Sequence, residues 1–273
     1  MNFLKIAINL YQRGLYILRA DGPKYVFVKG YNYLSLVIYT YVQRIAAVDK
    51  LMYRMSLKRL RRYMADERNL NDIIDTAYAF KGFGIYRTIK PTQYKEEITV
   101  FAELCQKHSP KVIVEIGTAY GGVLYILSRY LRSCKKIISM DLDDRFYKLG
   151  FFRKRTKFIK EFAPDKEMHF MNGNSHDEMI EAELSKILMG EKIDLLFIDG
   201  DHSYAGVRDD FERYRKYVAP GGIIALHDVG QLEHVLGPPL YWKEIKQADY
   251  KTREIIFQDA KTLWGIGVVF IGN

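Results

Sequence analysis

The chain has 273 residues, of which 48% are hydrophobic and 27% are charged. This composition excludes a fibrous protein and a disordered chain, and the length allows one large domain or one domain with an appendage. The two cysteines, Cys105 and Cys134, lack CxxC spacing. The cysteine count therefore argues against a disulfide framework and a thiolate zinc site, and it fits a reducing compartment.

The formal net charge of +9 is concentrated near the N-terminus. Residues 1–63 contain twelve Lys and Arg, only two Asp and Glu, and nine tyrosines. A basic region of this kind predicts a phosphate-bearing partner, and an anionic membrane surface fits it better than nucleic acid. The alternative is a helical lid or homo-oligomerisation module with a solvated basic face.

The N-terminal region offers no clear membrane span or secretion signal. Its longest uncharged run, residues 30–43, is shorter than the roughly 20 residues that a spanning helix needs. Lys5 and Arg13 interrupt any signal-peptide core. We therefore expect a cytoplasmic protein, peripheral at the inner membrane surface if the basic region binds lipid.

The first 95 residues are predicted to form helices followed by an irregular segment. Residues 1–66 are predicted to form two or three helices, interrupted at Asp21-Gly22-Pro23, with a helix that includes Leu51, Met55, Leu60 and Tyr63. Residues 67–95 are predicted to be a connecting or lid segment, because Gly82, Gly84 and Pro91 favour irregular structure. The remainder, 96–273, is predicted to be a separate domain.

Short apolar runs then alternate with helix-length intervals, beginning with a helix at 93–106. Strands are predicted at Lys111–Ile116, Lys136–Asp141, Met168–Asn172, Ile193–Asp199, Gly222–His227, Arg253–Gln258 and Gly267–Ile271. This alternation indicates βαβ crossovers and an α/β fold with a doubly wound, mostly parallel seven-stranded sheet. The last two strands are close enough in sequence to form an antiparallel edge.

Ligands of such sheets bind beyond the carboxyl ends of the strands. The first strand ends in Glu115-Ile-Gly117-Thr118-Ala-Tyr-Gly121-Gly122, where glycines permit a tight turn and the approach of a ligand to a helix start. The spacing differs from the GxGxxG of dinucleotide enzymes, and a packing turn is the alternative. The second strand ends at Asp141, whose carboxylate suits ribose hydroxyls, whereas Asp143 is a solvated loop acid.

The third strand leads into Asn174, Ser175 and His176, which either contact an adenine edge or cap a turn. Strand four is followed by Asp199, Asp201 and His202, and strand five by His227 and Asp228. Because adjacent parallel strands lie about 4.8 Å apart, these side chains are expected to converge. A divalent cation such as Mg²⁺ or Mn²⁺ would account for so much charge in one place.

These motifs together resemble class I S-adenosylmethionine-dependent methyltransferases. The resemblance covers residues 92–273 and includes Phe197-Ile-Asp-Gly-Asp-His-Ser-Tyr204 and Pro220-Gly-Gly222. It is similar to the metal-dependent O-methyltransferases, and most of all to the macrolide sugar O-methyltransferase and cephalosporin-hydroxylase-like group. The resemblance implies a Rossmann-like methyltransferase domain that acts on a hydroxyl of a sugar, glycolipid or other small molecule.

By this resemblance, the S-adenosylmethionine site consists of Glu115, Gly117, Thr118, Gly121, Asp141, Asn174, Ser175, His176 and Asp199. Asp199, His227 and Asp228 match the metal ligands of the family, which usually has Asp, Glu or Asn at the position of His227. His202 matches the catalytic base and, with Asp199, forms the predicted catalytic pair. Tyr86 or Gln93 is expected to help cover the cofactor.

Other readings of the same residues are open. Asp201, Ser203 and Tyr204 also fit a turn leading into a helix at 205–218, on which Asp209, Asp210 and Glu212 are expected to form a solvated face. His227 and Asp228 would also fit a purely structural pair. Alternative functions are a nucleotide-dependent oxidoreductase and a membrane- or nucleic-acid-binding protein whose methyltransferase-like domain is inactive. No motif for methylation of base amines occurs, so nucleic acid is not expected as a substrate.

Overall fold

The computed structural model describes residues 45–142, 152–230, 237–257 and 264–272. The elements in chain order are α3 (Ala46–Asp66), α4 (Leu70–Ala79), η1 (Gly84–Tyr86), α5 (Lys95–His108), β1 (Val112–Ile116), α6 (Gly122–Tyr130), β2 (Lys136–Asp141), α8 (Phe152–Ile159), η2 (Lys160–Phe162), β3 (Glu167–Asn172), α9 (Glu178–Leu188), β4 (Ile193–Ile198), α10 (Tyr204–Tyr214), η3 (Arg215–Tyr217), β5 (Val218–His227), α11 (Gly237–Gln247), β6 (Lys251–Ile255) and β7 (Ile266–Phe270). All seven predicted strands are present.

The strands form one sheet in the order β3-β2-β1-β4-β5-β7-β6. The first five pair in parallel, and β7 pairs antiparallel with both β5 and β6. The predicted doubly wound sheet with an antiparallel edge is therefore confirmed. Because the chain order reverses beside β1 and β4, the crevice beyond these two strand ends is where this topology places a ligand.

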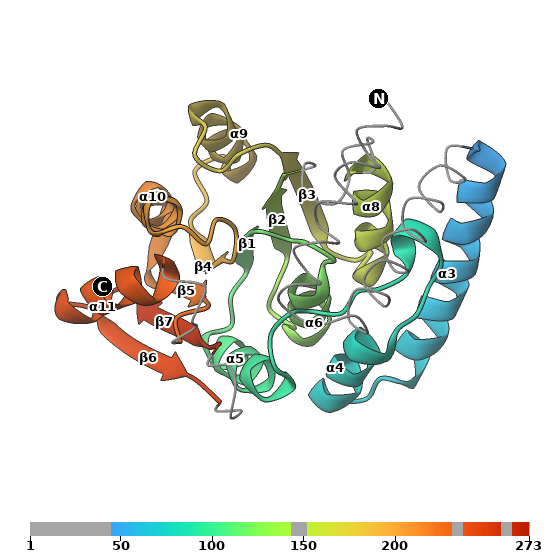
Figure 1. The fold of residues 1–273 in the computed structure, drawn as a ribbon, viewed down its shortest axis with the longest axis horizontal. Helices are drawn as coiled ribbons and strands as arrows, with labels where there is room; N and C mark the ends of the chain where they lie inside the picture. Colours follow the sequence, from blue (N-terminus) through green and yellow to red (C-terminus); the bar gives the residue numbers. More distant parts are fainter. Residues whose placement is uncertain (1–44, 143–151, 231–236, 258–263, 273) are drawn as a thin grey trace, which may run out of the picture.

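Helices cover both faces of the sheet. Figure 1 shows α9, α10 and α11 on one side, and α3, α4, α5, α6 and α8 on the other. Each side has its own buried apolar cluster. Strand β1 alternates between the two, with Ile113 in one cluster and Val112 and Val114 in the other, as the two-residue period of a strand requires. Both faces of β1 are thus buried, which explains its continuous apolar run.

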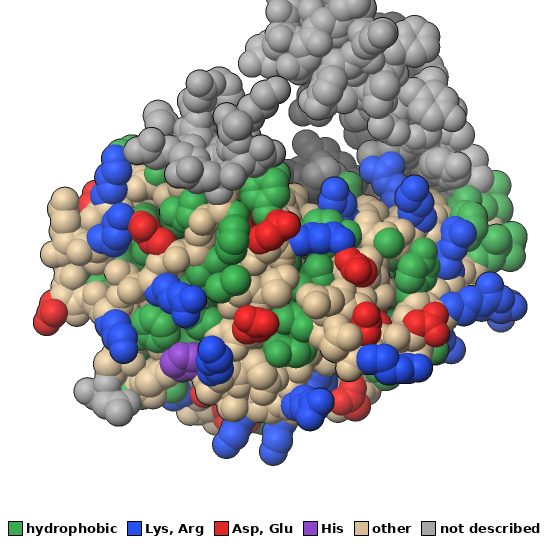
Figure 2. Space-filling model, turned by 90° about the horizontal axis from the view of Figure 1, so that it is seen from below, with side chains coloured by type: hydrophobic (Ala, Val, Ile, Leu, Met, Phe, Trp, Pro, Cys, Tyr) green, Lys and Arg blue, Asp and Glu red, His purple; other side chains and the backbone are tan. Residues whose placement is uncertain are grey.

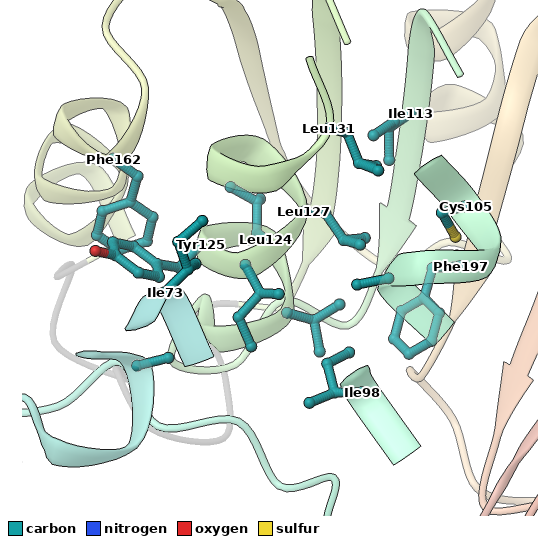
Figure 3. Close-up of a cluster of buried hydrophobic side chains, with 14 of the residues drawn as sticks. Ile73, Ile98, Cys105, Ile113, Leu124, Tyr125, Leu127, Leu131, Phe162 and Phe197 are labelled. Atoms are coloured by element: carbon teal, nitrogen blue, oxygen red, sulfur yellow. The ribbon is translucent and has the colours of Figure 1, made fainter. Parts of the chain in front are cut away.

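The larger cluster joins the helical front of the chain to the sheet. Figure 3 shows Ile73 of α4 beside Leu124 and Tyr125 of α6, and Ile98 and Cys105 of α5 near Phe197 of β4. Phe101 and Phe197 have ring centroids 5.4 Å apart. The front helices therefore share the core of the sheet rather than forming a core of their own.

Helix α3 confirms the helix predicted near residue 60, but only part of its predicted apolar face is buried. Leu60 is fully buried, whereas Leu51 is 57% exposed and Met55 is 43% exposed. The predicted helices before residue 45 and the break at Asp21 lie outside the described residues. In the described parts of the chain, no helix is both long and apolar enough to cross a membrane.

The face that carries α4 and α5 has a mixed charge. Figure 2 shows its Lys and Arg side chains spread over the surface with acidic side chains between them. A surface that binds nucleic acid through its phosphates instead needs Lys and Arg gathered on one face. This face therefore gives no support to a nucleic-acid partner.

Candidate active site

The turn between β1 and α6, residues 117–122, is built on left-handed backbone. Gly117 has φ +90° and Gly121 has φ +74°. A Cβ on Gly117 would lie 2.0 Å from the carbonyl oxygen of Asp199, so only glycine lets this turn approach the end of β4. Ala119 is also left-handed, with φ +45°. Strain in a non-glycine residue is a common property of functional sites.

Three carboxylates surround this glycine turn. Asp141 follows from β2 and accepts hydrogen bonds from the backbone N–H groups of Ala119 and Leu142, both at 2.8 Å. Glu115 is buried on β1, and burial raises its pKa to about 8, with further contributions from the negative charges of Asp199 and Asp141. A cationic ligand would relieve this repulsion, so the turn is suited to a positively charged molecule.

The loop after β3 contacts side chains of helix α10. Oδ1 of Asn174 accepts a 3.2 Å hydrogen bond from the backbone N–H of His176, and the carbonyl oxygen of Ser175 accepts a 2.5 Å bond from the hydroxyl of Tyr214. Oδ1 of Asp210 lies 3.4 Å from Nε2 of His176. The three predicted adenine-contacting residues therefore occur on one anchored loop.

The expectation of a solvated face at Asp210 was wrong. Its side chain is fully buried, and burial raises its pKa to about 6, opposed by the nearby Ser175 and His176 side chains. Sequence periodicity did not reveal this position, because Asp209 and Glu212 beside it are exposed or half-exposed, as expected of a helix surface. The buried carboxylate was detectable only once the loop after β3 was placed above it.

The ends of β4 and β5 bring together four residues, Asp199, His202, His227 and Asp228, called here the acid–histidine cluster. Nδ1 of His227 lies 3.1 Å from Oδ1 of Asp199 and 3.1 Å from Oδ1 of Asp228. Nε2 of His202 lies 3.4 Å from Oδ1 of Asp199, and its Nδ1 lies 3.5 Å from Oδ2 of Asp228. The predicted convergence of these side chains is observed.

Each charged side chain in this cluster shifts the pKa values of its neighbours. Desolvation works against ionisation of Asp199, but the two histidines outweigh it and hold its pKa well below its usual range. Burial likewise opposes the charged form of His227, yet the two aspartates raise its pKa to about 9. Hydrogen bonding to Asp199 raises the pKa of His202 as well. The cluster is therefore a compact set of opposite charges.

The donor set fits a divalent cation. Asp199, His202 and Asp228 each offer a ligand atom, and these atoms lie within 4.8 Å of one another. The two carboxylates suit Mg²⁺ or Mn²⁺, and the imidazole of His202 beside them can either complete the ligand set or accept a proton. His227 is not part of this group of three: its side chain is only 3% exposed, and its Nδ1 faces both carboxylates. Asp228 adopts φ +60°, a strained conformation for a non-glycine residue.

The residues around His202 mainly shape a turn. Oδ1 of Asp201 accepts a 2.8 Å hydrogen bond from the backbone N–H of Ser203. Ser203 is the N-cap of α10 and accepts a 3.0 Å bond from the N–H of Gly206. Tyr204 begins the helix, and its hydroxyl donates to Glu244. The structural interpretation of these three residues is therefore confirmed.

Residues 87–94, called here the front segment, lie against the glycine turn. A Cβ on Gly122 would lie 2.6 Å from the carbonyl oxygen of Ile89 and 2.4 Å from the nitrogen of Pro91. Gly122 thus lets backbone approach backbone. The side-chain amide of Gln93 donates a 2.8 Å hydrogen bond to Oδ2 of Asp199, so the front segment reaches the acid–histidine cluster.

Tyr86 lies elsewhere. Its ring is buried against Phe158, and its hydroxyl donates a 3.1 Å hydrogen bond to Asp49 of α3. Arg155 of α8 connects residues 85–88 to the glycine turn instead, and the sequence analysis did not identify it. Its guanidinium donates to the carbonyl oxygens of Ile85 and Thr88 at 3.1 and 2.8 Å and to that of Tyr120. No motif surrounds Arg155 in the sequence that would have marked it.

Comparison with known proteins identifies the domain. Residues 114–229 match a family model described as a methyltransferase domain. The chain is 34% identical over 125 residues to uncharacterized protein R132 of Acanthamoeba polyphaga mimivirus, covering 42% of this chain and 50% of that protein. It is 26% identical over 142 residues to uncharacterized protein y4gI of Sinorhizobium fredii, covering 50% of this chain and 15% of that protein. The chain thus spans half or less of these curated relatives.

Solved structures agree on the fold. An O-methyltransferase from Bacillus cereus in complex with SAH is similar with TM-score 0.50 and 17% identity, over 66% of this chain and 84% of that one. The O-methyltransferase TomG from Streptomyces achromogenes has TM-score 0.50 and 13% identity, over 76% of this chain and 92% of that one. These structures show that the chain shares their fold, and the family model places a match to a methyltransferase domain at residues 114–229 of that fold.

Proposed function

We propose that the protein is an O-methyltransferase that transfers a methyl group from S-adenosylmethionine to a hydroxyl of a sugar, glycolipid or other small molecule. The observation that carries the proposal is the ring of three carboxylates, Glu115, Asp141 and Asp199, around a strained glycine turn. A sulfonium with an ammonium group is the kind of ligand that such a site stabilises. Asp141 is assigned to the ribose, and Asn174, Ser175 and His176 to the adenine.

The chemistry follows from the acid–histidine cluster. The acceptor oxygen forms a bond to the methyl carbon as the carbon–sulfur bond breaks, and the hydroxyl proton passes to His202. His202 suits this role because its side chain is 39% exposed and an acceptor can reach it, whereas His227 is buried. Asp199 orients His202, and alignment of the two substrates supplies much of the rate.

We assign a divalent cation to Asp199 and Asp228, with His227 as the hydrogen-bonding group that holds both carboxylates in place. A bound Mg²⁺ or Mn²⁺ would lower the pKa of an acceptor hydroxyl. His227 was predicted to be a ligand, and its position behind the carboxylates favours the orienting role instead.

Cofactor binding is tested by calorimetry with S-adenosylhomocysteine and, separately, with NAD. We expect micromolar binding of the first and none of the second, and the reverse would favour an oxidoreductase. Asp141→Asn should weaken the binding of S-adenosylhomocysteine at least about tenfold, because charge-assisted hydrogen bonds are lost. The matched control is Asp165→Asn, an exposed aspartate beyond α8. Equal binding by both variants would contradict the ribose assignment.

Turnover is tested with methyl-labelled S-adenosylmethionine and a panel of hydroxyl acceptors. His202→Ala should remove most turnover and leave S-adenosylhomocysteine binding within about threefold of wild type. EDTA should abolish turnover, and Mn²⁺ or Mg²⁺ should restore it. Full activity in EDTA would remove the metal from the mechanism, and normal turnover by the variant would exclude His202 as the base.

We further propose peripheral binding to an anionic membrane through residues 1–66, on the cytoplasmic side. Its support is α3, where the exposed Leu51 and Met55 lie beside the exposed cations Arg54 and Lys58. Full-length protein should sediment with vesicles containing phosphatidylserine, and Leu51→Ser/Met55→Ser should reduce the bound fraction. No sedimentation of the full-length chain would end this proposal.

A further inference from the structure

A groove of about 610 Å³ opens beside the acid–histidine cluster. It is lined by most of the front segment, the start of α5, Tyr78, Tyr120 and Trp264. We propose that this groove binds the methyl acceptor and selects an anionic sugar, one that carries a phosphate or a carboxylate. The inference rests on the proposed methyl transfer, and it adds a substrate class that the methyltransferase domain alone does not specify.

The groove reaches the reacting groups at one end. Gln93 lines it and donates the 2.8 Å hydrogen bond to Asp199. The ring of Trp264, which also lines it, has its centroid 6.4 Å from that of His227. Tyr120 belongs to the glycine turn. A molecule seated in the groove would thus have the acid–histidine cluster on one side and the cofactor turn on the other.

The groove is also lined by cations. Arg87 and Lys90 both line it, and among the described residues no carboxylate forms an ion pair with either. Lys95 differs, because its ammonium lies 2.5 Å from Asp75 and its charge is already balanced. One carboxylate, Glu96, also lines the groove. Arg87 contacts the Tyr120 hydroxyl at 3.4 Å, and Lys90 lies 5.6 Å from the centroid of the Tyr78 ring. These neutral partners do not balance the two positive charges, which therefore favour a ligand with a fixed negative charge.

The aromatic side chains provide a surface for a ring. Tyr94 and Trp264 are stacked, with centroids 4.9 Å apart and planes at 29°. The ring surface that this stack leaves uncovered offers apolar area to the C–H face of a sugar, and polar groups of the groove remain for its hydroxyls.

The spacing sets the size of the acceptor. Lys90 precedes Gln93 by three residues, so their Cα atoms are at most about 11 Å apart. A single sugar ring with its charged substituent can span this separation. The charge would lie near Arg87 and Lys90, and the reacting hydroxyl near Asp199 and His202. A neutral sugar would use only the aromatic end.

The test compares four probes on the wild-type protein saturated with S-adenosylhomocysteine: a neutral hexose, the matching hexose 1-phosphate, the matching hexuronate, and inorganic phosphate. Binding is measured by calorimetry, and initial rates with labelled S-adenosylmethionine follow for the sugars. We expect the hexose 1-phosphate or the hexuronate to bind at least about tenfold more tightly than the neutral hexose. The better of the two identifies which anion is preferred, and inorganic phosphate should compete with it.

The decisive variant is Arg87→Gln/Lys90→Gln. We expect it to weaken the binding of the anionic sugar at least about 30-fold, because two charge-assisted contacts are removed. The affinity for the neutral hexose should not change. The control is Lys107→Gln/Lys111→Gln, which removes the same charge near the amino end of β1, opposite the site. Circular dichroism and melting temperature would verify that both variants fold.

Three outcomes overturn the inference: no preference for anionic over neutral probes, equal binding of the anionic sugar by the double variant, or loss of S-adenosylhomocysteine binding in that variant. The last would show that Arg87 and Lys90 hold the cofactor's own carboxylate. Failure of the wild-type protein to bind S-adenosylhomocysteine would instead refute the proposed function, so the two failures are distinguishable.

Discussion

Cofactor affinity should depend steeply on pH through Glu115. Burial and the charges of Asp199 and Asp141 raise the pKa of Glu115 to about 8, so the free site holds a proton at neutral pH. The ammonium group of S-adenosylhomocysteine favours the ionised carboxylate, as do the ammonium and sulfonium groups of S-adenosylmethionine. About 1% of Glu115 is ionised at pH 6.0 and about 24% at pH 7.5 for a pKa near 8. Apparent affinity should therefore rise about 25-fold over this interval.

The assay is calorimetry with S-adenosylhomocysteine between pH 6.0 and 7.5, a range that stays below the ordinary pKa of an α-amino group at about 7.7–8.0. At pH 7.0, two buffers with different ionisation enthalpies should reveal the release of about 0.9 proton per bound molecule when the pKa of Glu115 is near 8. Glu115→Gln should bind more weakly at pH 7.5 and should lose both the slope and the proton release.

Free-protein stability provides a second test with a defined sign. A carboxyl group whose pKa rises from 4.5 to about 8 on folding makes the folded state bind more protons than the unfolded state between these values. Stability of the cofactor-free protein should fall as the pH rises from 4.5 to 8, and Glu115→Gln should reduce that fall.

In the binding assay, a wild-type affinity for S-adenosylhomocysteine that changes less than threefold from pH 6.0 to 7.5, without proton release, would refute the reasoning.

Asp210→Asn should weaken S-adenosylhomocysteine about tenfold, because the buried carboxylate supports the loop after β3, and an unchanged dissociation constant in calorimetry would remove that role. Gly122→Ala should destabilise the protein by about 2 kcal/mol, since its Cβ would lie 2.4 Å from the nitrogen of Pro91. Thermal melts would test this, and equal melting temperatures would contradict the close approach. Asp228→Asn should lower Mn²⁺ affinity at least about tenfold in equilibrium dialysis. Undiminished binding would exclude Asp228 as a ligand.

The sheet was predictable because its signals are local. Each strand is a short apolar run, and burial on both faces of β1 makes that run continuous. Boundaries were less accurate: β5 begins at Val218, four residues before the predicted Gly222, and a register shift on β4 follows Val218, where Gly221 has φ +78°. The position of β7 between β5 and β6 required the tertiary structure, since the sequence indicated only that the last two strands could pair.

The site was predictable where topology alone determines it. Asp141, Asp199 and Asp228 follow the ends of strands, so their arrangement at one edge follows from the sheet. Asp210, Arg155 and Gln93 make their contacts across long sequence separations: Arg155 donates to a carbonyl 70 residues away, and Gln93 to a carboxylate 106 residues away. No periodic pattern encodes such contacts. The exposed position of Leu51 had the same cause, because helical spacing does not tell which side of a helix meets the sheet.

The contact between Gln93 and Asp199 has a consequence for how this enzyme can diversify. The front segment, which we propose to bind the acceptor, also donates a hydrogen bond to Asp199, the acid that we assign to the reaction centre. A sequence change that admits a new acceptor will therefore alter the orientation of that acid, and turnover will change together with selectivity. Engineering a new substrate would then need paired substitutions, one in the wall that receives the molecule and one that restores the geometry of Asp199.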